Sequence, residues 1–383
     1  MTSLRTVVTA CAIALIPAFA ASAAPTDAGA VLAQYGRLVH ASYTDATAAA
    51  ADLKRAVDRF LERPDEARLG AARRAWLAAR DWYGQTEAFR FYGGPIDGED
   101  GPEGRINAWP MDEAYVDGVV GSPEAGLINR PDVPITADSL SALNEKDGEE
   151  NISTGWHAIE FMLWGQDLSA DGPGQRPYTD FVDGRAPHAD RRRAYLRVVT
   201  DLLIEDLTSV RDAWAPDADN YRRRFEADPA NLARMISALG ILSRGELAGE
   251  RIEVALDSQS QEDEHSCFSD NTHRDVVANV RGIRNVWLGT FKRRDGSVVE
   301  GPSLHDLVHD KDAAIADQLD RDMAASLAAA EAIPAPFDQA ILAGSAGRPK
   351  VEATVSRLKT QTTSIVAAAA ALGIRRLNTT MPE

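Results

Sequence analysis

The chain has 383 residues, of which 44% are hydrophobic and 26% charged, and its formal net charge is −17 at pH 7. A surface with this excess of carboxylates repels nucleic acid and anionic lipid, which excludes both as binding partners, and it favours the capture of cations. The length predicts about two domains, each with enough apolar core to fold without disulfide bonds.

Residues 1–23 have the pattern of a secretory signal peptide. Arg5 is followed by an apolar stretch and then by Ala21-Ser22-Ala23, after which we expect cleavage. Because Arg5 is the only charged side chain removed, the net charge changes from −17 to −18. No later segment approaches the roughly 20 apolar residues of a membrane span. The sequence therefore predicts an exported protein of the periplasm or cell surface that does not span a membrane.

The cysteines limit the kinds of metal site that are available. Cys11 is removed with the signal peptide, which leaves Cys267 alone in the mature chain. A single cysteine forms neither an internal disulfide nor a thiolate metal cluster. Any metal site must therefore use nitrogen and oxygen ligands.

Apolar side chains recur at helical spacing through most of the mature chain, and the alternation typical of strands is nearly absent. The expected helical segments are residues 31–64, 65–89, 189–214, 230–259, 271–289, 312–333 and 351–374. This pattern predicts an all-α protein of two helical bundles, residues 24–216 and residues 228–383, joined around residues 216–228.

A faint duplication indicates that the two bundles are related by an internal pseudo-repeat. A Trp-Leu pair is followed by Gly-Pro in both halves: Trp76-Leu77 with Gly94-Pro95, and Trp287-Leu288 with Gly301-Pro302. The first half also carries a long insertion, residues 92–139, rich in Gly, Pro and Asp. Trp109, Met111 and Tyr115 give the insertion apolar anchors, so we expect an ordered loop packed over a cleft, with disorder as the alternative.

The segment "GWHAIEFMLWGQD", residues 155–167, places a histidine and a glutamate on one face of an apolar helix. Ser153 or Thr154 can cap its start and Gly165 can end it. Residues three apart share a face, so His157 and Glu160 can converge on one divalent or trivalent cation. The alternative is a hydrogen-bonded pair that satisfies two polar groups in a bundle core.

A second group of acidic and histidine residues lies in the other half. Glu246, Glu250 and Glu253 are spaced to share one face of an α-helix, and further candidates follow them: Glu262, Glu264, His265, Asp270, His273 and Asp275. Facing helices of a bundle build metal sites from such side chains, so some of them are expected opposite His157. The alternative is ion pairing with Arg244, Arg251 and Arg274 on a solvated face.

Three segments in this order resemble the imelysin family, also called insulin-cleaving metalloproteinases or iron-regulated protein A-like proteins. They are "GRINAWPMDEAYVD", "GWHAIEFMLWGQD" with its Gly-x-His-x-x-Glu element (Gly155, His157, Glu160), and "GELAGERIEVALDSQSQEDEHSCFSDNTHRD". The resemblance implies a two-domain, all-helical, pseudo-symmetric protein of the periplasm or surface, linked to iron acquisition and assigned to the metallopeptidases. It also implies that the family's His-x-x-Glu site, between the domains, corresponds to His157 and Glu160.

Metal binding requires fewer specific residues than peptide hydrolysis does. We expect a metal ion, iron or zinc, bound by His157 and Glu160, with Glu246, Glu250 and His273 as candidate further ligands. The metal could be bound as a bare ion or as a metal complex. Other iron-uptake proteins are possible binding partners. A metallopeptidase is the first alternative, but His-Glu-x-x-His is absent and the spacing selects no base among Glu246, Glu250 and His273. A metal-free helical binding module is the second alternative.

The remaining histidines and tryptophans are expected to have simpler roles. His305 and His309 are spaced to chelate a second metal or to lie on a solvated helix face. His40 and His188 are interpreted as structural. Core packing is expected for four tryptophans: Trp76, Trp82, Trp214 and Trp287.

Overall fold

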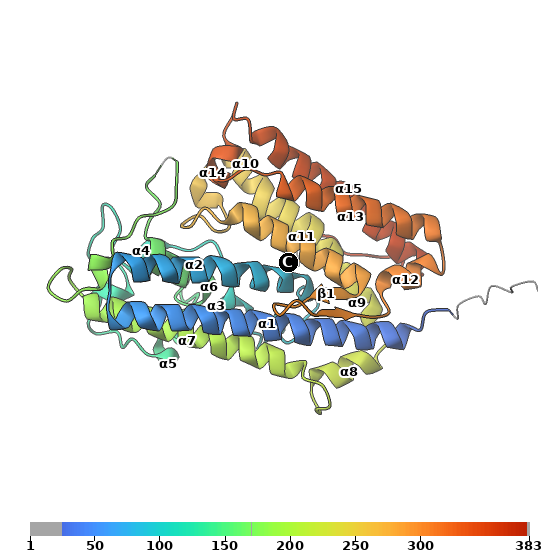
Figure 1. Ribbon diagram of the computed structural model, residues 1–383, viewed down its shortest axis with the longest axis horizontal. Helices are drawn as coiled ribbons and strands as arrows, with labels where there is room; N and C mark the ends of the chain where they lie inside the picture. The colour runs from blue at the N-terminus through green and yellow to red at the C-terminus, as the bar shows by residue number, and fades with distance from the viewer. Residues whose placement is uncertain (1–24, 170, 381–383) are drawn as a thin grey trace, which may run out of the picture.

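The computed structural model describes residues 25–169 and 171–380, so the predicted signal peptide lies outside the described residues. The prediction of an all-α protein is confirmed (Figure 1). Elements of the first half are α1 (Ala28–Glu62), α2 (Glu66–Tyr83), η1 (Gly84–Phe89), α3 (Glu103–Ile106), α4 (Glu113–Val116), η2 (Leu127–Asn129), α5 (Ala137–Leu143), α6 (Gly155–Trp164), η3 (Tyr178–Phe181), α7 (Ala189–Ala213) and α8 (Tyr221–Ala227). Elements of the second half are α9 (Asn231–Ile241), the π-helix η4 (Leu242–Glu253), α10 (Val254–Ser258), η5 (Gln261–Asp263), α11 (Thr272–Leu288), β1 (Thr290–Lys292), β2 (Val298–Glu300), α12 (Leu304–His309), α13 (Ala313–Glu331), α14 (Phe337–Ile341) and α15 (Arg348–Ala371).

The helices pack as two groups that lie one above the other in Figure 1. The first helical group consists of α1 with α2 and α7 against it and α6 against both of these. The second helical group consists of η4, α9, α11, α13 and α15, in which α13 and α15 form the most extensive pair. The predicted junction at residues 216–228 contains α8, which packs on α1.

The two groups meet where α11 crosses η1. An ideal Cβ on Gly282 of α11 would lie 2.4 Å from the carbonyl oxygen of Gln85, and one on Gly84 would lie 2.7 Å from the Cβ of Ala278. Glycine at both positions lets the two backbones approach more closely than any other residue would allow. This close approach fixes the distance between the polar side chains that α2 and α11 carry.

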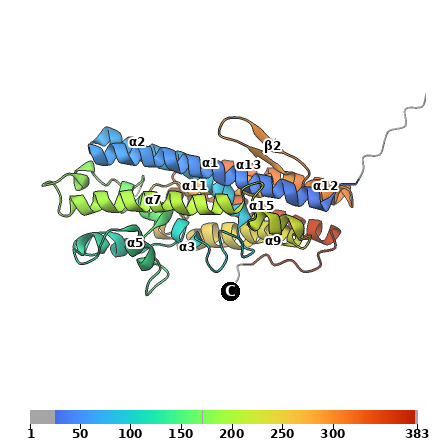
Figure 2. The same cartoon turned by 90° about the horizontal axis from the view of Figure 1, so that it is seen from below.

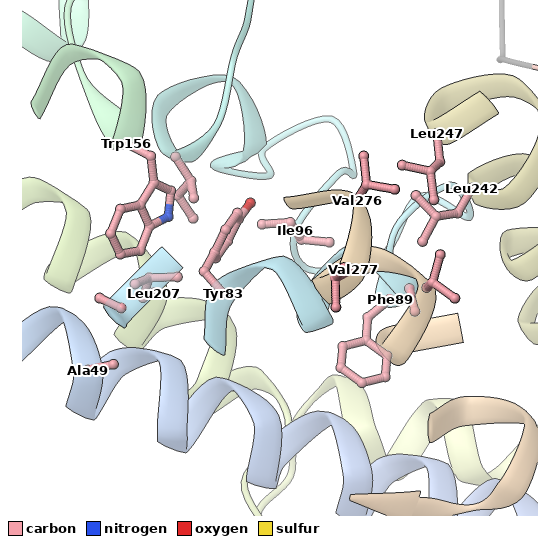
Figure 3. Close-up of a cluster of buried hydrophobic side chains, with 14 of the residues drawn as sticks. Ala49, Tyr83, Phe89, Ile96, Trp156, Leu207, Leu242, Leu247, Val276 and Val277 are labelled. Atoms are coloured by element: carbon pink, nitrogen blue, oxygen red, sulfur yellow. The ribbon is translucent and has the colours of Figure 1, made fainter. Parts of the chain in front are cut away.

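One hydrophobic core runs through both groups. Figure 3 shows Tyr83 and Trp156 of the first group in the same cluster as Val276 and Leu242 of the second. The predicted packing role of the tryptophans is confirmed, because Trp76, Trp214 and Trp287 are fully buried and Trp82 packs, half-buried, beside Phe291. The core is therefore continuous across both groups. The division into two domains and the internal pseudo-repeat remain predictions.

Strand structure among the described residues is confined to one antiparallel hairpin and an isolated bridge between Val119 and Ser122. In the hairpin, Phe291 of β1 pairs with Val299 of β2. Figure 2 shows the hairpin projecting beside α1, and its Phe291 packs on Leu38 and Ala41 of that helix. The hairpin therefore covers the flank of α1 rather than forming a sheet.

The long insertion at residues 92–139 is ordered, as predicted. It contains the short elements α3, α4 and η2, and its predicted anchors are bonded: the Trp109 indole donates to the carbonyl oxygen of Glu264 (2.7 Å), and the Tyr115 hydroxyl donates to that of Leu143 (2.7 Å). Part of the insertion, residues 117–129, lines a cavity of about 870 Å³ together with residues that follow α6. None of the described helices combines the length and the apolar character needed to cross a membrane.

Candidate functional site

Helix α6 carries His157 and Glu160 into the interior of the protein. Gly155 begins the helix with φ +85°, and an ideal Cβ there would lie 2.5 Å from the carbonyl oxygen of Ile106, so glycine is required. Gly165 ends the helix with φ +73°, as predicted. Thr154 stands at the N-cap position, but its hydroxyl donates to the Arg105 carbonyl and caps no helical N–H. Every residue of α6 is buried, which places both polar side chains out of solvent.

His157 and Glu160 form a buried pair. Nδ1 of His157 lies 2.9 Å from Oε2 of Glu160. The other carboxylate oxygen, Oε1, accepts hydrogen bonds from the backbone N–H (3.0 Å) and the hydroxyl (2.6 Å) of Ser269. Ser269 belongs to the loop that precedes α11, so the pair connects α6 to the second half of the chain.

Arg80 of α2 lies at the centre of the surrounding polar residues. Its Nε lies 3.2 Å from Oδ1 of Asp275, a residue of α11, and its Nη2 lies 3.4 Å from Nε2 of His157 and 3.3 Å from the ring nitrogens of His265. Its Nη1 donates to the side-chain oxygen of Asn107. We call Arg80, His157, Glu160, His265 and Asp275 the polar centre.

Asp275 contacts two further side chains besides Arg80. Its Oδ2 lies 2.8 Å from Nδ1 of His265 and accepts a hydrogen bond from the Ser266 hydroxyl. The rings of His157 and His265 meet edge to face, with centroids 4.9 Å apart. Trp109, from the long insertion, contacts the ring of His265 edge to face at 5.7 Å.

The charges of the polar centre follow from burial and from Arg80. Burial, assisted by Arg80 and His265, lowers the pKa of His157 well below its usual value, and burial with Arg251 nearby lowers the pKa of His265 to about 4. Burial raises the pKa of Glu160 to about 8. Burial acts in the same direction on Asp275, but the Arg80 guanidinium outweighs it and holds the pKa of Asp275 far below its usual range. At pH 7 both imidazoles are therefore neutral, and Arg80 and Asp275 form the charged pair.

A second buried ion network lies beside the polar centre. Arg251 of η4 donates from Nη2 to Glu87 of η1 and to Glu246 (both 2.6 Å), and from Nη1 to the side chain of Asn279 (2.7 Å). Arg90 adds an ion pair to the same oxygen of Glu87 (2.8 Å). For Glu87, burial alone would raise the pKa, but Arg90 and Arg251 hold it far below its usual range. Glu246 and Arg251 are therefore ion-paired, as the alternative predicted, but inside the protein rather than on a solvated face.

The structure brings together only part of the predicted ligand set. His157 and Glu160 are paired, but among residues 25–169 and 171–380 no hydrogen bond or ion pair joins either of them to Glu246, Glu250 or His273. Glu250 is exposed, and His273 is half-buried with Nδ1 3.1 Å from the Asp270 carbonyl oxygen.

The three glutamates of η4 do not share a face as the α-helical spacing predicted. The backbone here is a π-helix, in which the N–H of Val254 bonds to the carbonyl of Gly249, five residues earlier. Within this helix Glu246 points inward to Arg251, whereas Glu250 is exposed. Glu253 pairs with Arg244 (2.9 Å) and with Lys359.

Several residues of the site were not singled out from the sequence. Arg80 carried a usable signal, because it lies on the buried face of α2 with Trp76 and Tyr83, where a basic residue is rarely tolerated without a partner. Asn107 and Ser269 carried no comparable signal. The second candidate pair, His305 and His309, stacks at 5.6 Å, and Nε2 of His305 lies 3.3 Å from Asp320.

As arranged here, the polar centre does not fit a metal ion. Both nitrogens of His157 have neighbours, and the guanidinium beside Nε2 would repel a cation at that nitrogen. In the part of the chain that the structure describes, no three histidine, cysteine, aspartate or glutamate side chains already stand in position to hold a metal. Ligation by His157 would therefore require Arg80 to move away.

Comparison with known proteins shows what this chain is similar to. A family model described as Imelysin (peptidase family M75) matches residues 39–365. Iron-regulated protein A of Synechococcus elongatus is 29% identical over 313 residues, which are 79% of this chain and 74% of that protein.

Two solved structures share the fold. One, described as an iron-regulated protein A precursor from Parabacteroides distasonis, has a TM-score of 0.70 at 19% identity, covering 92% of this chain and 97% of that one. The other is an imelysin-like protein from Psychrobacter arcticus, with a TM-score of 0.65 at 14% identity, covering 94% of this chain and all of that one. At these identities the likeness concerns the fold alone.

Proposed function

The chain belongs to the imelysin family, and from this premise we propose that it is an exported, iron-linked protein that binds a metal ion, iron or zinc, where its two helical groups meet. The link to iron is supported by the similarity to Iron-regulated protein A. Export is supported by the signal-like residues 1–23.

One observation carries the proposal: a buried imidazole and carboxylate, 2.9 Å apart, face the second half of the chain. The raised pKa of Glu160, about 8, reflects burial that no adjacent cation fully offsets. Once Arg80 had moved away from His157, a metal ion beside Glu160 would replace the proton and supply that charge. His157 is neutral at pH 7, which is the form that ligates metals.

The first prediction compares wild type with the His157→Ala/Glu160→Ala double variant by titration calorimetry with zinc and ferrous ions. Each lost ligand should weaken binding at least tenfold, about 1.4 kcal/mol. An Asp317→Asn variant, which removes an exposed carboxylate from α13, controls for net charge and should bind as wild type does.

The competing interpretation, a purely structural His-Glu pair, gives a different pattern. The double variant would then melt at a lower temperature and yet keep the wild-type affinity for zinc and iron. Equal affinities in the two proteins would therefore refute the ligand assignment.

A metallopeptidase remains the alternative that the family description suggests. His157 is 2% exposed and Glu160 is 0% exposed, and neither lines the cavities of about 870 and 570 Å³. A peptide substrate would therefore have to open the protein before it reached them. Hydrolysis of an unstructured chain that zinc restores after chelation, and that His157→Ala abolishes, would make the peptidase the primary function.

A further inference from the structure

Five of the ten buried acidic side chains among the described residues are ion-paired with arginine, and four have no basic partner. Of the acidic side chains that are buried among the described residues, Asp45, Glu87, Asp117, Asp206 and Asp275 are each ion-paired with at least one arginine. Glu160 is bonded to His157 and Ser269. The exceptions are Asp167, Glu264, Asp270 and Asp338, for which the described structure contains no ion pair with a basic side chain. We call these four the carboxylate cluster.

The carboxylate cluster is assembled from three parts of the chain. Asp167 follows α6, Glu264 and Asp270 lie in the loop between η5 and α11, and Asp338 belongs to α14. The first two segments are bonded to each other, since the Gln261 side chain donates to the Asp167 carbonyl and the N–H of Gly174 donates to that of Phe268 (2.9 Å).

Six of the eight oxygens of the cluster are buried with no donor in good hydrogen-bond geometry. Glu264 is 0% exposed and Asp270 7%, and the side chains that interact with their carboxyl groups are Thr272 for Glu264 and Asp167 for Asp270. One oxygen of Asp167 and one of Asp338 are also without partners; the second oxygen of Asp338 accepts a hydrogen bond from Gln339 (2.7 Å). Buried carboxylates in this state are costly unless they are paired or bound to a metal.

The four carboxyls are close enough to affect one another's ionisation. Burial raises the pKa of Asp270 to about 7, and the neighbouring Asp167 and Asp338 raise it further. Burial likewise raises the pKa of Glu264 well above its usual range; the Thr272 hydroxyl opposes the shift, and Asp338, Asp270 and Asp167 add to it. The cluster therefore holds either protons or a positive ion.

A cavity of about 570 Å³ borders the carboxylate cluster at Asp270. Asp270 lines it together with Ser269 and with Ala335 and Pro336, just before α14. A hydrated ion can enter a space of that size and exchange its waters for carboxylate oxygens.

We propose that the carboxylate cluster binds a hard divalent cation, for which calcium is the best fit. Its donors are all oxygens, which suit calcium and magnesium and offer nothing to softer metals. Calcium accepts six to eight oxygens in irregular geometry, whereas magnesium demands a near-ideal octahedron, and donors from three separate segments meet the first requirement more readily. The carboxyls must still draw together around the ion, because no three of them already stand in metal-holding positions in the described chain.

This site does not depend on the proposed role of His157 and Glu160. The two sites use different donors, nitrogen with oxygen in one case and oxygen alone in the other. Ser269 and Asp270 are adjacent, so the sites are neighbours, and separate variants are needed to distinguish them.

The second prediction is tested on the mature chain after treatment with a chelator, by calorimetry with calcium chloride and by thermal melting with and without calcium. Wild type should bind calcium and melt at a higher temperature with it. Asp270→Asn and Glu264→Gln should each weaken calcium binding at least tenfold. Because each replaces a buried acid, which must be protonated when no cation is bound, by a neutral amide of similar shape, both variants should melt no lower than wild type without calcium, which shows that they are folded.

The controls separate this site from the other proposal. Asp317→Asn and the His157→Ala/Glu160→Ala double variant should both keep the wild-type calcium affinity. Wild type that binds no calcium, or folded Asp270→Asn and Glu264→Gln variants that bind it as tightly as wild type, would overturn the inference. Tighter binding of magnesium, or of ferric ion supplied as citrate, would overturn the assignment to calcium.

Discussion

At the scale of single residues, burial decides the charge of the two histidines in the polar centre. Each is 2% exposed, and Arg80 lies within 3.4 Å of both rings. A proton on either ring would place a second positive charge beside the guanidinium in the buried interior. Neutral imidazoles and one arginine-carboxylate pair are therefore the arrangement that the site favours near neutral pH.

The third prediction follows from the pKa of His265, which is about 4 in the folded protein against an ordinary value of 6.5. Between these values the unfolded chain binds a proton that the folded protein does not, so the free energy of unfolding falls as the pH falls from 6.5 to 4. The slope contributed by this residue is up to about 1.4 kcal/mol per pH unit. We expect a His265→Gln variant to be less stable at pH 7 and to approach wild type as the pH is lowered.

The measurement is urea denaturation of both proteins between pH 7.5 and 4.5. We compare the free energy of unfolding of the two proteins because Glu160 changes the stability of both in the opposite direction. The pKa of Glu160 is raised to about 8, so this residue stabilises the fold as the pH falls from 8 toward 4.5. A stability difference that stays constant across this range would show that His265 is not the titrating group.

Sequence patterns indicated some of these residues and missed others for a physical reason. His157 and Glu160 could be paired because both lie on one short helix, whose geometry fixes their spacing. Arg80 and Asp275 come from helices far apart in the chain, and only packing of α2 and α11 brings them together. Spacing along the sequence therefore cannot predict that Arg80 and Asp275 lie in contact.

At the scale of elements, helix periodicity predicted most of the secondary structure. Segments such as α7, α11 and α13 follow closely from apolar side chains at helical spacing. The π-helix η4 does not, because its sequence has the apolar spacing of an ordinary α-helix. The hairpin β1–β2 was also unexpected, since its strands contain three residues each.

The fourth prediction concerns the crossing of α11 and η1. Gly282→Ala gains the higher helix propensity of alanine, about 1 kcal/mol, but its Cβ would lie 2.4 Å from the Gln85 carbonyl oxygen and force the backbones apart. Forcing extra volume into a packed contact costs about 1–3 kcal/mol, so we expect a net loss of stability.

Gly70→Ala is the matched control for that substitution. Gly70 lies inside α2, and the nearest atom to an added Cβ is the end of the flexible Arg74 side chain at 3.4 Å. The same change should therefore stabilise the protein by about 0.5–1 kcal/mol. Denaturation curves that moved in the same direction for both variants would show that the crossing is not closely packed.

At the scale of the whole molecule, the two helical groups share both a core and buried ion pairs. The hydrophobic cluster is continuous across them, and Arg251 joins Glu87 at 2.6 Å. Separating the groups would expose apolar surface and leave charged side chains without partners, which costs about 3–5 kcal/mol for a single buried pair. The prediction of two domains from chain length takes no account of such contacts.

The fifth prediction is that the protein unfolds in one cooperative transition. Tryptophan fluorescence reports mainly on the first helical group, which contains Trp76 and Trp156, whereas circular dichroism reports on the helices of both. The two signals should give coincident curves in urea. Two separated transitions would instead support independent domains divided near residues 216–228.

The Arg80–Asp275 pair also has a consequence for the order of events when the chain first folds. The two residues are 195 positions apart, so Asp275 is synthesised long after α2 has been completed. Until it arrives, Arg80 lacks its charged partner, and the contacts between α2 and α11 cannot form. Contacts between such distant residues carry a loop-closure cost and form late. The polar centre therefore closes only once nearly three quarters of the chain is present, and a truncated first half would lack the carboxylate that pairs with Arg80.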